Sequence, residues 1–461
     1  MTGELDLAIV GSGGGAFAAA IAARRRDLRV VMIERETIGG TCVNVGCIPS
    51  KALLAAAEAH WRAGHLRFPG IRTAAGAVDL TAVIAAKDEI VASLRRQKYV
   101  DLAAEYGFEL VPGDARFVGG PALDVDGRRI EAAHYLVATG AEPHVPEIPG
   151  LCESGYLTST TAMALDHLPE SLLVIGGGYV ALEQAQLFAH LGSRVTVLVR
   201  STLARGEEPE VAAAIRAAFL DDGIEVVEGV MPSTVRRAGG DVAVADGTRE
   251  WRAEHVLVAT GRRPRTDGLQ LDAVGVAAGD RGEVIVGPDM RTANPRIWAA
   301  GDVTGHPQFV YVAARHGAIV VDNAFDGAAR KIDYTAMPRI TFTNPTLASA
   351  GLTAAEAQLA GHDVDSRVLD LDAVPRAIVS RSTRGLAKLV ADRATGRVLG
   401  IHLVGDGAGD VILAGVYAIE AGMTVEQMAT SWNPYLTLGE AVHLAAQSFT
   451  RDSSRLSCCA A

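Results

Sequence analysis

Apolar runs and a glycine-rich turn at the start of the chain predict a strand, a turn, a helix and a second strand. Residues 7–10 are apolar, the glycines of 11–16 follow, and an alanine-rich stretch extends to about residue 26. A second apolar run, 28–33, ends at Glu34. This order is typical of a βαβ unit that begins a parallel sheet.

The same pattern recurs in the middle of the chain. Residues 172–175 predict a strand and 176–181 a turn, and the helix that follows is expected to stop at Gly192, a favourable C-terminal cap. The next predicted strand, 194–199, ends at Arg200. The pattern therefore predicts two dinucleotide-binding folds of the Rossmann type.

Later segments suggest a return to the first fold and then a separate α/β domain. The tetrapeptide Val-Ala-Thr-Gly stands at the end of both folds, at 137–140 and 258–261. A further strand-like run, 297–300, precedes Gly-Asp. From about Pro338 the pattern predicts antiparallel strands interleaved with amphipathic helices. The predicted domains are 1–150 for the first fold, 151–265 for the second, 266–337 for the return to the first, 338–450 for the C-terminal domain and 451–461 for a tail.

Composition excludes several classes of protein. The 461 residues are 49% hydrophobic and 21% charged, which suits several globular cores. A net charge of -11 argues against a nucleic-acid partner, which needs a basic face. The longest suspicious apolar run, 411–419, is far shorter than the roughly 20 residues that span a bilayer. The N-terminal apolar stretch has the wrong charge polarity for a signal peptide, so we expect a cytoplasmic protein with no membrane span.

Both glycine-rich turns have the G-x-G-x-x-G/A spacing. The first glycine permits the tight turn, the second lets the backbone approach a pyrophosphate, and the small third residue lets the helix pack on the strand. A purely structural strand–turn–helix is the alternative for each copy. The residues concerned are Gly11, Gly13 and Ala16 in the first turn and Gly176, Gly178 and Ala181 in the second.

The end of the second strand distinguishes the two folds. Glu34 lies where a carboxylate would hydrogen-bond a ribose hydroxyl. The second fold has Arg200 there, with Arg205 nearby, and guanidinium groups bind phosphate oxygens in pairs. The second fold is therefore predicted to prefer NADPH, unless these arginines are merely solvated.

Residues 39–51, GGTCVNVGCIPSK, contain two cysteines near the start of a predicted helix. A helix N-terminus and the nearby Lys51 favour thiolate over thiol at Cys42 and Cys47. A buried structural pair and half of a metal site are the alternatives. A metal site normally needs C-x₂-C with a second pair, which the sequence does not offer.

This segment resembles the redox-active disulfide segment of the flavoprotein disulfide reductases, which include glutathione reductase, lipoamide dehydrogenase and the mercuric reductases. The resemblance covers nearly the whole chain in order. It implies a glutathione reductase-like α/β fold, with FAD in the first fold, NADPH in the second and a C-terminal dimerisation domain. It also implies a homodimer in which each tail serves the partner's site.

The resemblance assigns roles to individual residues. Cys47 would be the charge-transfer thiolate beside the flavin, and Cys42 the interchange thiol that meets the substrate. Lys51 and Glu183 would pair beside the flavin, and Tyr179 would cover the nicotinamide pocket. The further cofactor contacts that it implies are Thr41, Thr139, Gly140, Gly261 and, at the ribityl and phosphate region of FAD, Asp302.

Two departures narrow the resemblance to the mercuric reductases. Counting back from Glu440, Tyr435 occupies the place of the acid–base histidine of glutathione reductase and lipoamide dehydrogenase. A phenol whose pKa lies near 10 is poor at proton transfer at neutral pH. The adjacent Cys458 and Cys459, followed by two alanines, resemble the mercuric reductase tail.

The chemistry of these cysteines agrees with mercury as the substrate. Hg(II) is a soft cation, and thiolates are the soft ligands of proteins. The resemblance implies that Cys458 and Cys459 take Hg(II) from solution thiols and pass it to Cys42 and Cys47 for reduction to Hg(0). The alternatives are a reductase of an organic disulfide, a non-catalytic thiol protein that sequesters soft metals, and an inert tail.

Three further expectations concern residues outside this scheme. Glu440 and His443 have the spacing of a carboxylate-bridged iron site but lack a second copy, so His443 is expected at the surface or an interface. Cys152 is expected to be a buried free thiol. Many mercuric reductases carry an N-terminal metal-binding domain. Because this sequence begins at the FAD strand, we expect that domain to be absent and mercury to be delivered by the tail or by free thiols.

Overall fold

The computed structural model describes residues 5–451, and the chain divides into two compact units, which are taken separately below. The first unit comprises residues up to Ala52, Thr81–His144 and Gly261–Ile332, and the second comprises Leu53–Leu80, Val145–Thr260 and residues from Asp333 on. The first unit thus resumes at Gly261, whereas the sequence placed that return at residue 266. The five-part division drawn from the sequence stays a prediction.

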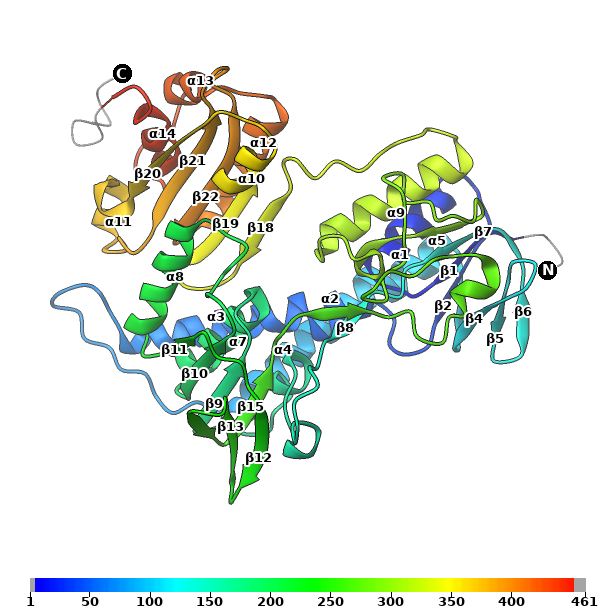
Figure 1. Cartoon of the computed structure of the whole chain (residues 1–461), viewed down its shortest axis with the longest axis horizontal. Coiled ribbons are helices and arrows are strands. Elements are labelled where there is room, and N and C mark those ends of the chain that lie inside the picture. Colours follow the sequence, from blue (N-terminus) through cyan, green and yellow to red (C-terminus); the bar gives the residue numbers. More distant parts are fainter. Residues whose placement is uncertain (1–4, 452–461) are drawn as a thin grey trace. The chain divides into compact units, whose positions relative to one another are not determined.

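A parallel five-stranded sheet forms the centre of the first unit (Figure 1). Its strand order is β17-β7-β1-β2-β3, so the order reverses between β1 and β7. Ligands of open parallel sheets bind at the carboxyl ends of the strands beside such a reversal. The strands are β1 (Leu5–Val10), β2 (Val30–Glu34), β3 (Glu109–Pro112), β7 (Ala132–Val137) and β17 (Ile297–Ala299).

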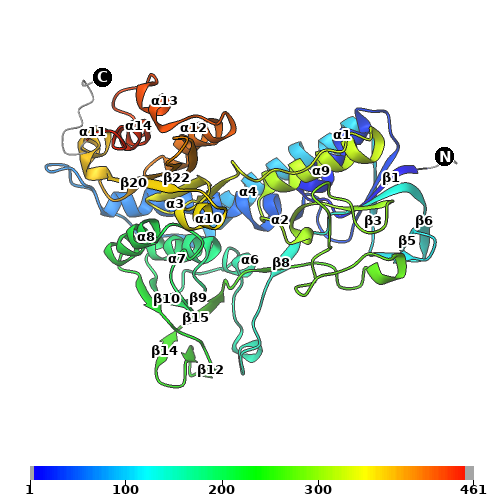
Figure 2. The ribbon, with the colours of Figure 1, turned by 45° about the horizontal axis from the view of Figure 1, so that its top comes forward.

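Two helices lie side by side on one face of this sheet, α1 (Gly14–Arg24) and α9 (Val310–Phe325) (Figure 2). They approach closely because a Cβ at Gly317 would lie 2.2 Å from the carbonyl oxygen of Gly15. The apolar residues of the other face pack against the antiparallel sheet β4-β5-β6. The remaining elements of this part of the chain are α2 (Gly40–Val45), α3 (Cys47–Gly64), α4 (Leu80–Arg95), the π-helical η1 (Arg96–Val100), α5 (Asp101–Tyr106), β4 (Ala115–Val118), β5 (Ala122–Val125), β6 (Arg128–Ile130), β8 (Ala141–Pro143), β16 (Arg262–Pro264), η3 (Leu271–Val274) and η4 (Gly301–Thr304).

A second parallel sheet, of order β11-β10-β9-β15, lies in the second unit. Helix α7 (Tyr179–Leu191) follows β9 and ends, as the sequence predicted, before Gly192, whose φ is 120°. The order again reverses beside the first strand, between β9 and β15. The other elements are η2 (Cys152–Ser154), α6 (Ser159–Ala162), β9 (Ser171–Ile175), β10 (Arg194–Val199), α8 (Pro209–Asp221), β11 (Glu225–Glu228), β12 (Thr234–Ala238), β13 (Asp241–Ala245), β14 (Glu250–Ala253) and β15 (His255–Val258).

The second unit also contains the predicted antiparallel sheet, of order β18-β19-β22-β21-β20. The antiparallel strands expected from about residue 338 are confirmed, and helices cover one apolar core against them. The elements are β18 (Pro338–Thr341), β19 (Thr346–Gly351), α10 (Ala354–Leu359), β20 (Val364–Asp370), η5 (Leu371–Ala373), α11 (Pro375–Val379), β21 (Leu386–Asp392), β22 (Val398–Gly405), α12 (Ala408–Glu420), α13 (Val425–Thr430) and α14 (Gly439–Gln447).

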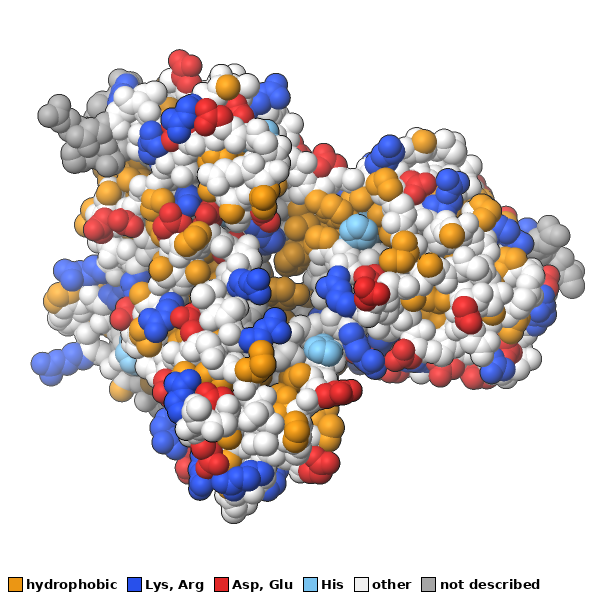
Figure 3. Space-filling view, viewed as in Figure 1, with side chains coloured by type: hydrophobic (Ala, Val, Ile, Leu, Met, Phe, Trp, Pro, Cys, Tyr) orange, Lys and Arg blue, Asp and Glu red, His pale blue; other side chains and the backbone are white. Residues whose placement is uncertain are grey.

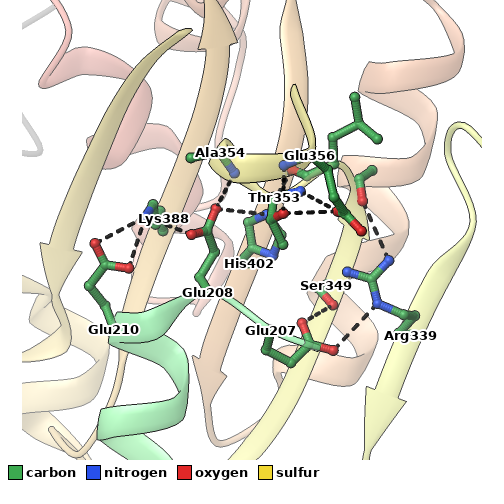
Figure 4. A network of polar contacts seen from close by, with 12 residues as sticks. Glu207, Glu208, Glu210, Arg339, Ser349, Thr353, Ala354, Glu356, Lys388 and His402 are labelled. Carbon is green, nitrogen blue, oxygen red and sulfur yellow. Dashed lines mark hydrogen bonds and ion pairs between the residues drawn. The ribbon is translucent and has the colours of Figure 1, made fainter. Parts of the chain in front are cut away.

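A buried polar network joins the start of α8 to this antiparallel sheet (Figure 4). Lys388 Nζ lies 2.9 Å from Glu208 Oε2 and 2.8 Å from Glu210 Oε2. Burial disfavours the charged lysine, but hydrogen bonds to Glu210 and Glu208 outweigh it and raise the pKa of Lys388. Ser349 Oγ donates to Glu207 at 2.8 Å beside it. The network ties the second dinucleotide fold to the C-terminal sheet.

The surface and the helices agree with the expectations from composition, whereas the position of Cys152 does not. Acidic and basic side chains are interspersed over the face seen in Figure 3. Between residues 5 and 451, no helix is both long enough and apolar enough to cross a bilayer. The prediction of a buried Cys152 is wrong, because this residue begins the short η2 and is exposed, while its neighbour Leu151 fills the core.

Candidate active site

The first glycine-rich turn lies at the carboxyl end of β1. Gly11 has a φ of 102°, and a Cβ there would lie 2.4 Å from the carbonyl oxygen of Ala138. Its N–H donates to the carbonyl oxygen of Ile33 at 2.8 Å. A Cβ at Gly13 would meet no atom within 4 Å, so the backbone of the turn faces open space. This is the cradle that a pyrophosphate at a helix N-terminus requires.

Glu34 is held at the end of β2 by two hydrogen bonds. Ser12 Oγ donates to Glu34 Oε2 at 2.5 Å, and the N–H of Glu36 donates to Oε1 at 2.9 Å. The same Ser12 Oγ accepts the N–H of Gly39 at 3.0 Å. Ser12 therefore connects the carboxylate predicted to bind ribose with the start of the cysteine segment.

A cavity of about 740 Å³ opens beside these residues. Its size falls in the range of small-molecule and cofactor sites. Six of the predicted cofactor residues line it, whereas Ala16 is buried inside α1 and neither Lys51 nor Asp302 belongs to the lining. An open backbone cradle, a fixed carboxylate and a large cavity fit FAD. The six lining residues are Gly11, Gly13, Glu34, Thr41, Thr139 and Gly140.

Asp302 follows β17, at the same edge of the sheet as the glycine turn. Burial raises the pKa of its carboxyl group, and the nearby Arg262 opposes this only in part. The N–H of the preceding Gly301 donates to Nδ1 of His316 at 3.1 Å. Because burial lowers the pKa of His316 to about 4, that ring is neutral and able to accept this bond. His316 thus fixes the backbone that carries Asp302.

The cysteine segment packs directly on the first glycine turn. Gly40 has a φ of 64°, and a Cβ there would lie 2.7 Å from the Cα of Gly13. Asn44 braces the segment, because its amide donates to the carbonyl oxygens of Ile38 at 3.0 Å and Gly40 at 2.9 Å. Arg95 donates to the side-chain Oδ1 of Asn44 at 3.1 Å. These contacts hold the segment at the edge of the cavity, which Gly40 and Asn44 help to line.

Cys42 lies in α2, and Cys47 is the first residue of α3; both are half-buried thiols that are not joined in a disulfide. A hydrogen bond to Cys47, burial and the negative charge of Cys47 all raise the pKa of Cys42. The thiol form of Cys42 is therefore favoured, while the N-terminus of α3 favours an anion at Cys47. In the part of the chain that is described, neither cysteine belongs to a cluster of three or more potential metal ligands.

Tyr99 is a site residue that sequence reasoning missed. It lies in the π-helical η1, its ring would lie 3.3 Å from a Cβ at Gly39, and it packs edge-on against Phe17 with ring centroids 4.7 Å apart. Burial and the charges of Cys42 and Cys47 raise the pKa of Tyr99 to about 12. It therefore stays a neutral phenol beside the cysteines. Asn44 and Arg95 were also missed, since a single sequence carries no signal for such contacts.

The second glycine turn repeats the geometry of the first. Gly176 has a φ of 140°, and a Cβ there would lie 2.2 Å from the carbonyl oxygen of Ala259. Its N–H donates to Leu198 at 3.0 Å, and a Cβ at Gly178 would meet no atom within 4 Å. Ala181, at the third position, is fully buried in α7. The second turn therefore also fits a pyrophosphate.

Arg200 and Arg205 lie in and after the turn that follows β10, and both are exposed. Two hydrogen bonds hold the loop between them. The N–H of Ala204 donates to the carbonyl oxygen of Gly177 at 2.9 Å, and the N–H of Leu203 donates to Oε1 of Glu228 at 2.8 Å. Neither guanidinium forms an ion pair within residues 5–451, so both can bind an added phosphate. The site suits NADPH better than NADH.

Tyr179 and Glu183 lie one helical turn apart at the start of α7. Tyr179 is 38% exposed, as a mobile cover would be, and Glu183 is buried. Glu183 Oε1 accepts the backbone N–H of Phe342 at 3.0 Å. The predicted Lys51–Glu183 pair stays a prediction, and so does the role of Gly261, whose carbonyl oxygen accepts the N–H of His144 at 2.9 Å.

Tyr435 is 59% exposed in the loop that precedes α14. Glu440 is buried at the start of that helix, and burial raises the pKa of its carboxyl group. Its Oε2 has no hydrogen-bond partner within the described chain. His443 is half-buried, with Nδ1 3.2 Å from the carbonyl oxygen of Met428. The remaining predicted mercury ligands, Cys458 and Cys459, lie outside the described residues.

Comparisons with known proteins agree with this geometry. Residues 5–317 match the pyridine nucleotide-disulphide oxidoreductase family and 337–446 its dimerisation domain. A mercuric reductase of Streptomyces lividans is 58% identical over 99% of this chain and 98% of its own, and one of Staphylococcus aureus is 46% identical over 99% and 85%.

Solved structures of similar proteins include an HOCl-induced flavoprotein disulfide reductase, RclA, of Escherichia coli. It has a TM-score of 0.86 and 29% identity, over 96% of this chain and 99% of that one. LpdA of Mycobacterium tuberculosis has a TM-score of 0.86 and 26% identity, over 97% and 100%. The predicted fold class is confirmed. The chain belongs to the pyridine nucleotide-disulphide oxidoreductase family and, within it, to the mercuric reductases.

Proposed function

We propose that this protein reduces Hg(II) to Hg(0) with electrons from NADPH, by way of FAD and the Cys42–Cys47 pair. The observation that carries the proposal is the similarity to mercuric reductases along nearly the full length of both chains. The site supports it, because the cysteine segment packs on the glycine turn of the FAD fold. In balance, NADPH and Hg(II) give NADP⁺, a proton and Hg(0).

The residues of the first fold would hold FAD, which when bound relays two electrons from NADPH. The backbone at Gly13 would approach the pyrophosphate, and Glu34 would accept a hydrogen bond from a ribose hydroxyl. Asp302, whose carboxyl pKa is raised by burial, would contact the ribityl and phosphate region. Cys47 would provide the thiolate nearest the flavin.

The residues of the second fold would bind NADPH. The turn around Gly178 would receive the pyrophosphate, and Arg200 and Arg205 would bind the 2′-phosphate. Tyr179 would cover the nicotinamide pocket until the cofactor enters. Lys51 and Glu183 would pair beside the flavin.

Mercury would travel between two pairs of thiols. Cys458 and Cys459 would take Hg(II) from its complexes with solution thiols by ligand exchange, and Cys42 and Cys47 would hold it for reduction. No proton relay to an organic thiol is needed, which suits the tyrosine at position 435. We expect a homodimer formed through residues 337–446, and the use of cysteine in this chain suits the reducing cytoplasm.

Steady-state turnover with mercuric ion in excess thiol tests the proposal. Wild-type protein should oxidise NADPH and release mercury vapour, and should reduce glutathione disulfide and lipoamide poorly. The double variant Cys458→Ser, Cys459→Ser should lose most turnover of thiol-bound Hg(II). Cys152→Ser, which removes an exposed thiol that belongs to neither pair, is the matched control and should behave as wild type. Brisk organic-disulfide turnover with an indifferent tail variant would support a disulfide reductase instead.

A further inference from the structure

Two histidines and a glutamate converge in the second dinucleotide fold, in the segments that lead into β9 and β15. His167 lies just before β9, and Glu254 and His255 lie where β14 ends and β15 begins. One potential ligand atom from each lies within 4.8 Å of the other two. We propose that these three side chains bind one divalent first-row transition cation of the Zn²⁺ class.

The distances are close to those of a coordination shell. Nε2 of His167 lies 2.8 Å from Glu254 Oε1, and Nε2 of His255 lies 3.7 Å from the same oxygen. Zinc binds imidazole nitrogen and carboxylate oxygen at about 2.0–2.2 Å, so ligands of a tetrahedral ion are about 3.3 Å apart. The two observed distances bracket that value, and small side-chain movements would complete the shell.

His255 provides an independent observation that points to a ligand at this site. Both of its ring nitrogens are buried, and neither has a hydrogen-bond partner within the described part of the chain. Buried polar atoms in native proteins are nearly always paired, and an unpaired one calls for a bound water or ion. A cation at Nε2 would satisfy one of the two nitrogens.

The side chains are oriented by neighbours, as metal ligands are. Nδ1 of His167 lies 2.7 Å from Asp166 Oδ1, which turns Nε2 toward Glu254. A carboxylate behind a histidine in this way fixes the ring and strengthens it as a ligand. Glu254 Oε2 accepts the N–H of Glu170 at 2.8 Å, which leaves Oε1 toward both histidines.

Exposure and composition indicate the kind of cation. The His167 side chain is 56% exposed and that of His255 18%, so the site is open to water on one side and has room for a fourth, solvent ligand. Two imidazoles and a carboxylate suit Zn²⁺ and its neighbours, whereas Hg(II) prefers thiolates. The site is thus distinct in chemistry from the mercury site.

Its position also separates it from the nucleotide. His255 is in register with Leu172 at the start of the parallel pair β9 and β15, whereas the glycine turn follows Ile175 at the other end. Bound metal would join the two strand starts and stabilise the second fold. It would not touch NADPH.

Calorimetric titration of ZnCl₂ into the full-length, FAD-loaded protein tests the proposal. The inner pair is oxidised to its disulfide, and Cys152, Cys458 and Cys459 are changed to serine, so that no thiol competes. This parent should bind one Zn²⁺ per subunit. His255→Ala and the exposed His167→Gln should each weaken binding about tenfold or more, and Asp166→Asn by about tenfold.

A histidine–carboxylate pair elsewhere gives the matched control. His362 lies 3.0 Å from Asp392 but belongs to no group of three potential ligands within the described residues, so His362→Ala should bind Zn²⁺ as the parent does. Zn²⁺ should also raise the melting temperature of the parent and not that of His255→Ala. A parent that binds no Zn²⁺, or an unchanged Kd in both His167→Gln and His255→Ala, would overturn the proposal.

Discussion

The two dinucleotide folds of this chain share their geometry and differ in one chemical choice. In each, the first glycine has a positive φ, and a Cβ there would clash with a carbonyl oxygen of the neighbouring strand, that of Ala138 or of Ala259. In each, the second glycine faces open space. The shared features are those that any pyrophosphate needs.

The difference lies at the end of the second strand. Glu34 is fixed by two hydrogen bonds at the rim of a cavity, whereas Arg200 and Arg205 are exposed on a fixed loop. Among residues 5–451, a cysteine segment packs against the turn of the first fold and none packs against that of the second. We infer that the glycine turn allows a dinucleotide to bind, that the residue after the second strand selects which nucleotide binds, and that the added cysteine segment provides the redox chemistry.

The largest effect is expected from the segment that only the first fold has. Cys47→Ser should abolish mercury reduction and the long-wavelength thiolate–flavin absorbance of the two-electron-reduced protein. Cys42→Ser should also stop turnover but retain that absorbance, because it leaves the Cys47 thiolate in place. Visible spectra under anaerobic reduction distinguish the two, and the reverse assignment would refute the roles given to the pair.

Matched substitutions in the two glycine turns should each impair the binding of a different cofactor. A non-glycine residue at positive φ costs about 1–2 kcal/mol, and the clash with a carbonyl oxygen adds to it. Gly11→Ala should yield protein without bound flavin, whereas Gly176→Ala should keep its flavin and raise the KM for NADPH. Gly229→Ala, at a φ of 73° with open space around the Cβ, isolates the backbone strain and should keep both cofactors. Equal flavin content in all three variants would contradict the assignment.

The first fold should lose flavin as the pH falls. The pKa of His316 is about 4 in the folded protein and 6.5 when unperturbed, so the unfolded state binds more protons between these values. The contribution of neutral His316 to the free energy of unfolding is complete above pH 6.5. It falls toward pH 4, by up to about 3 kcal/mol for a pKa difference of 2.5. Flavin fluorescence should report release in this window. His316→Gln, whose amide oxygen can replace Nδ1 as acceptor, should shift or flatten the profile, and an unchanged profile would count against the role of His316.

The smallest effect is expected from Arg200, the residue predicted to distinguish NADPH from NADH. Arg200→Glu should reduce the preference of kcat/KM for NADPH over NADH by roughly 10- to 100-fold, since a charge-assisted hydrogen bond contributes about 1.5–3 kcal/mol. Arg194→Glu makes the same charge change at the exposed start of the same strand and should leave the preference unchanged. A wild-type preference for NADH would show that the second fold was misread.

The sequence predicted what depends on local spacing. The turns at Gly11 and Gly176, the contrasting Glu34 and Arg200, and the cysteine pair each lie within one short segment. Tyr99 was missed because its position depends on a π-helical turn that leaves no distinct pattern. Cys152 was placed in the core because free cysteines are among the most often buried residues, but its neighbour Leu151 takes that position.

The cluster of His167, Glu254 and His255 could not be predicted either, because its residues are distant in the sequence. His167 and the Glu254–His255 pair are far apart in the chain, and a histidine beside an acidic residue is too common to signal a site. Only the pairing of β9 with β15 brings them together. The sequence also gave no sign that Asn44 and Arg95 brace the cysteine segment.

A single turnover without oxygen tests the central claim most directly. Enzyme reduced by one equivalent of NADPH is mixed with one equivalent of Hg(II), and NADP⁺, Hg(0) vapour and the charge-transfer absorbance are followed together. One Hg(0) is expected for each NADPH consumed, and the absorbance should be lost as mercury appears. Oxidation of NADPH without Hg(0), or Hg(0) formed equally well by Cys47→Ser, would contradict it.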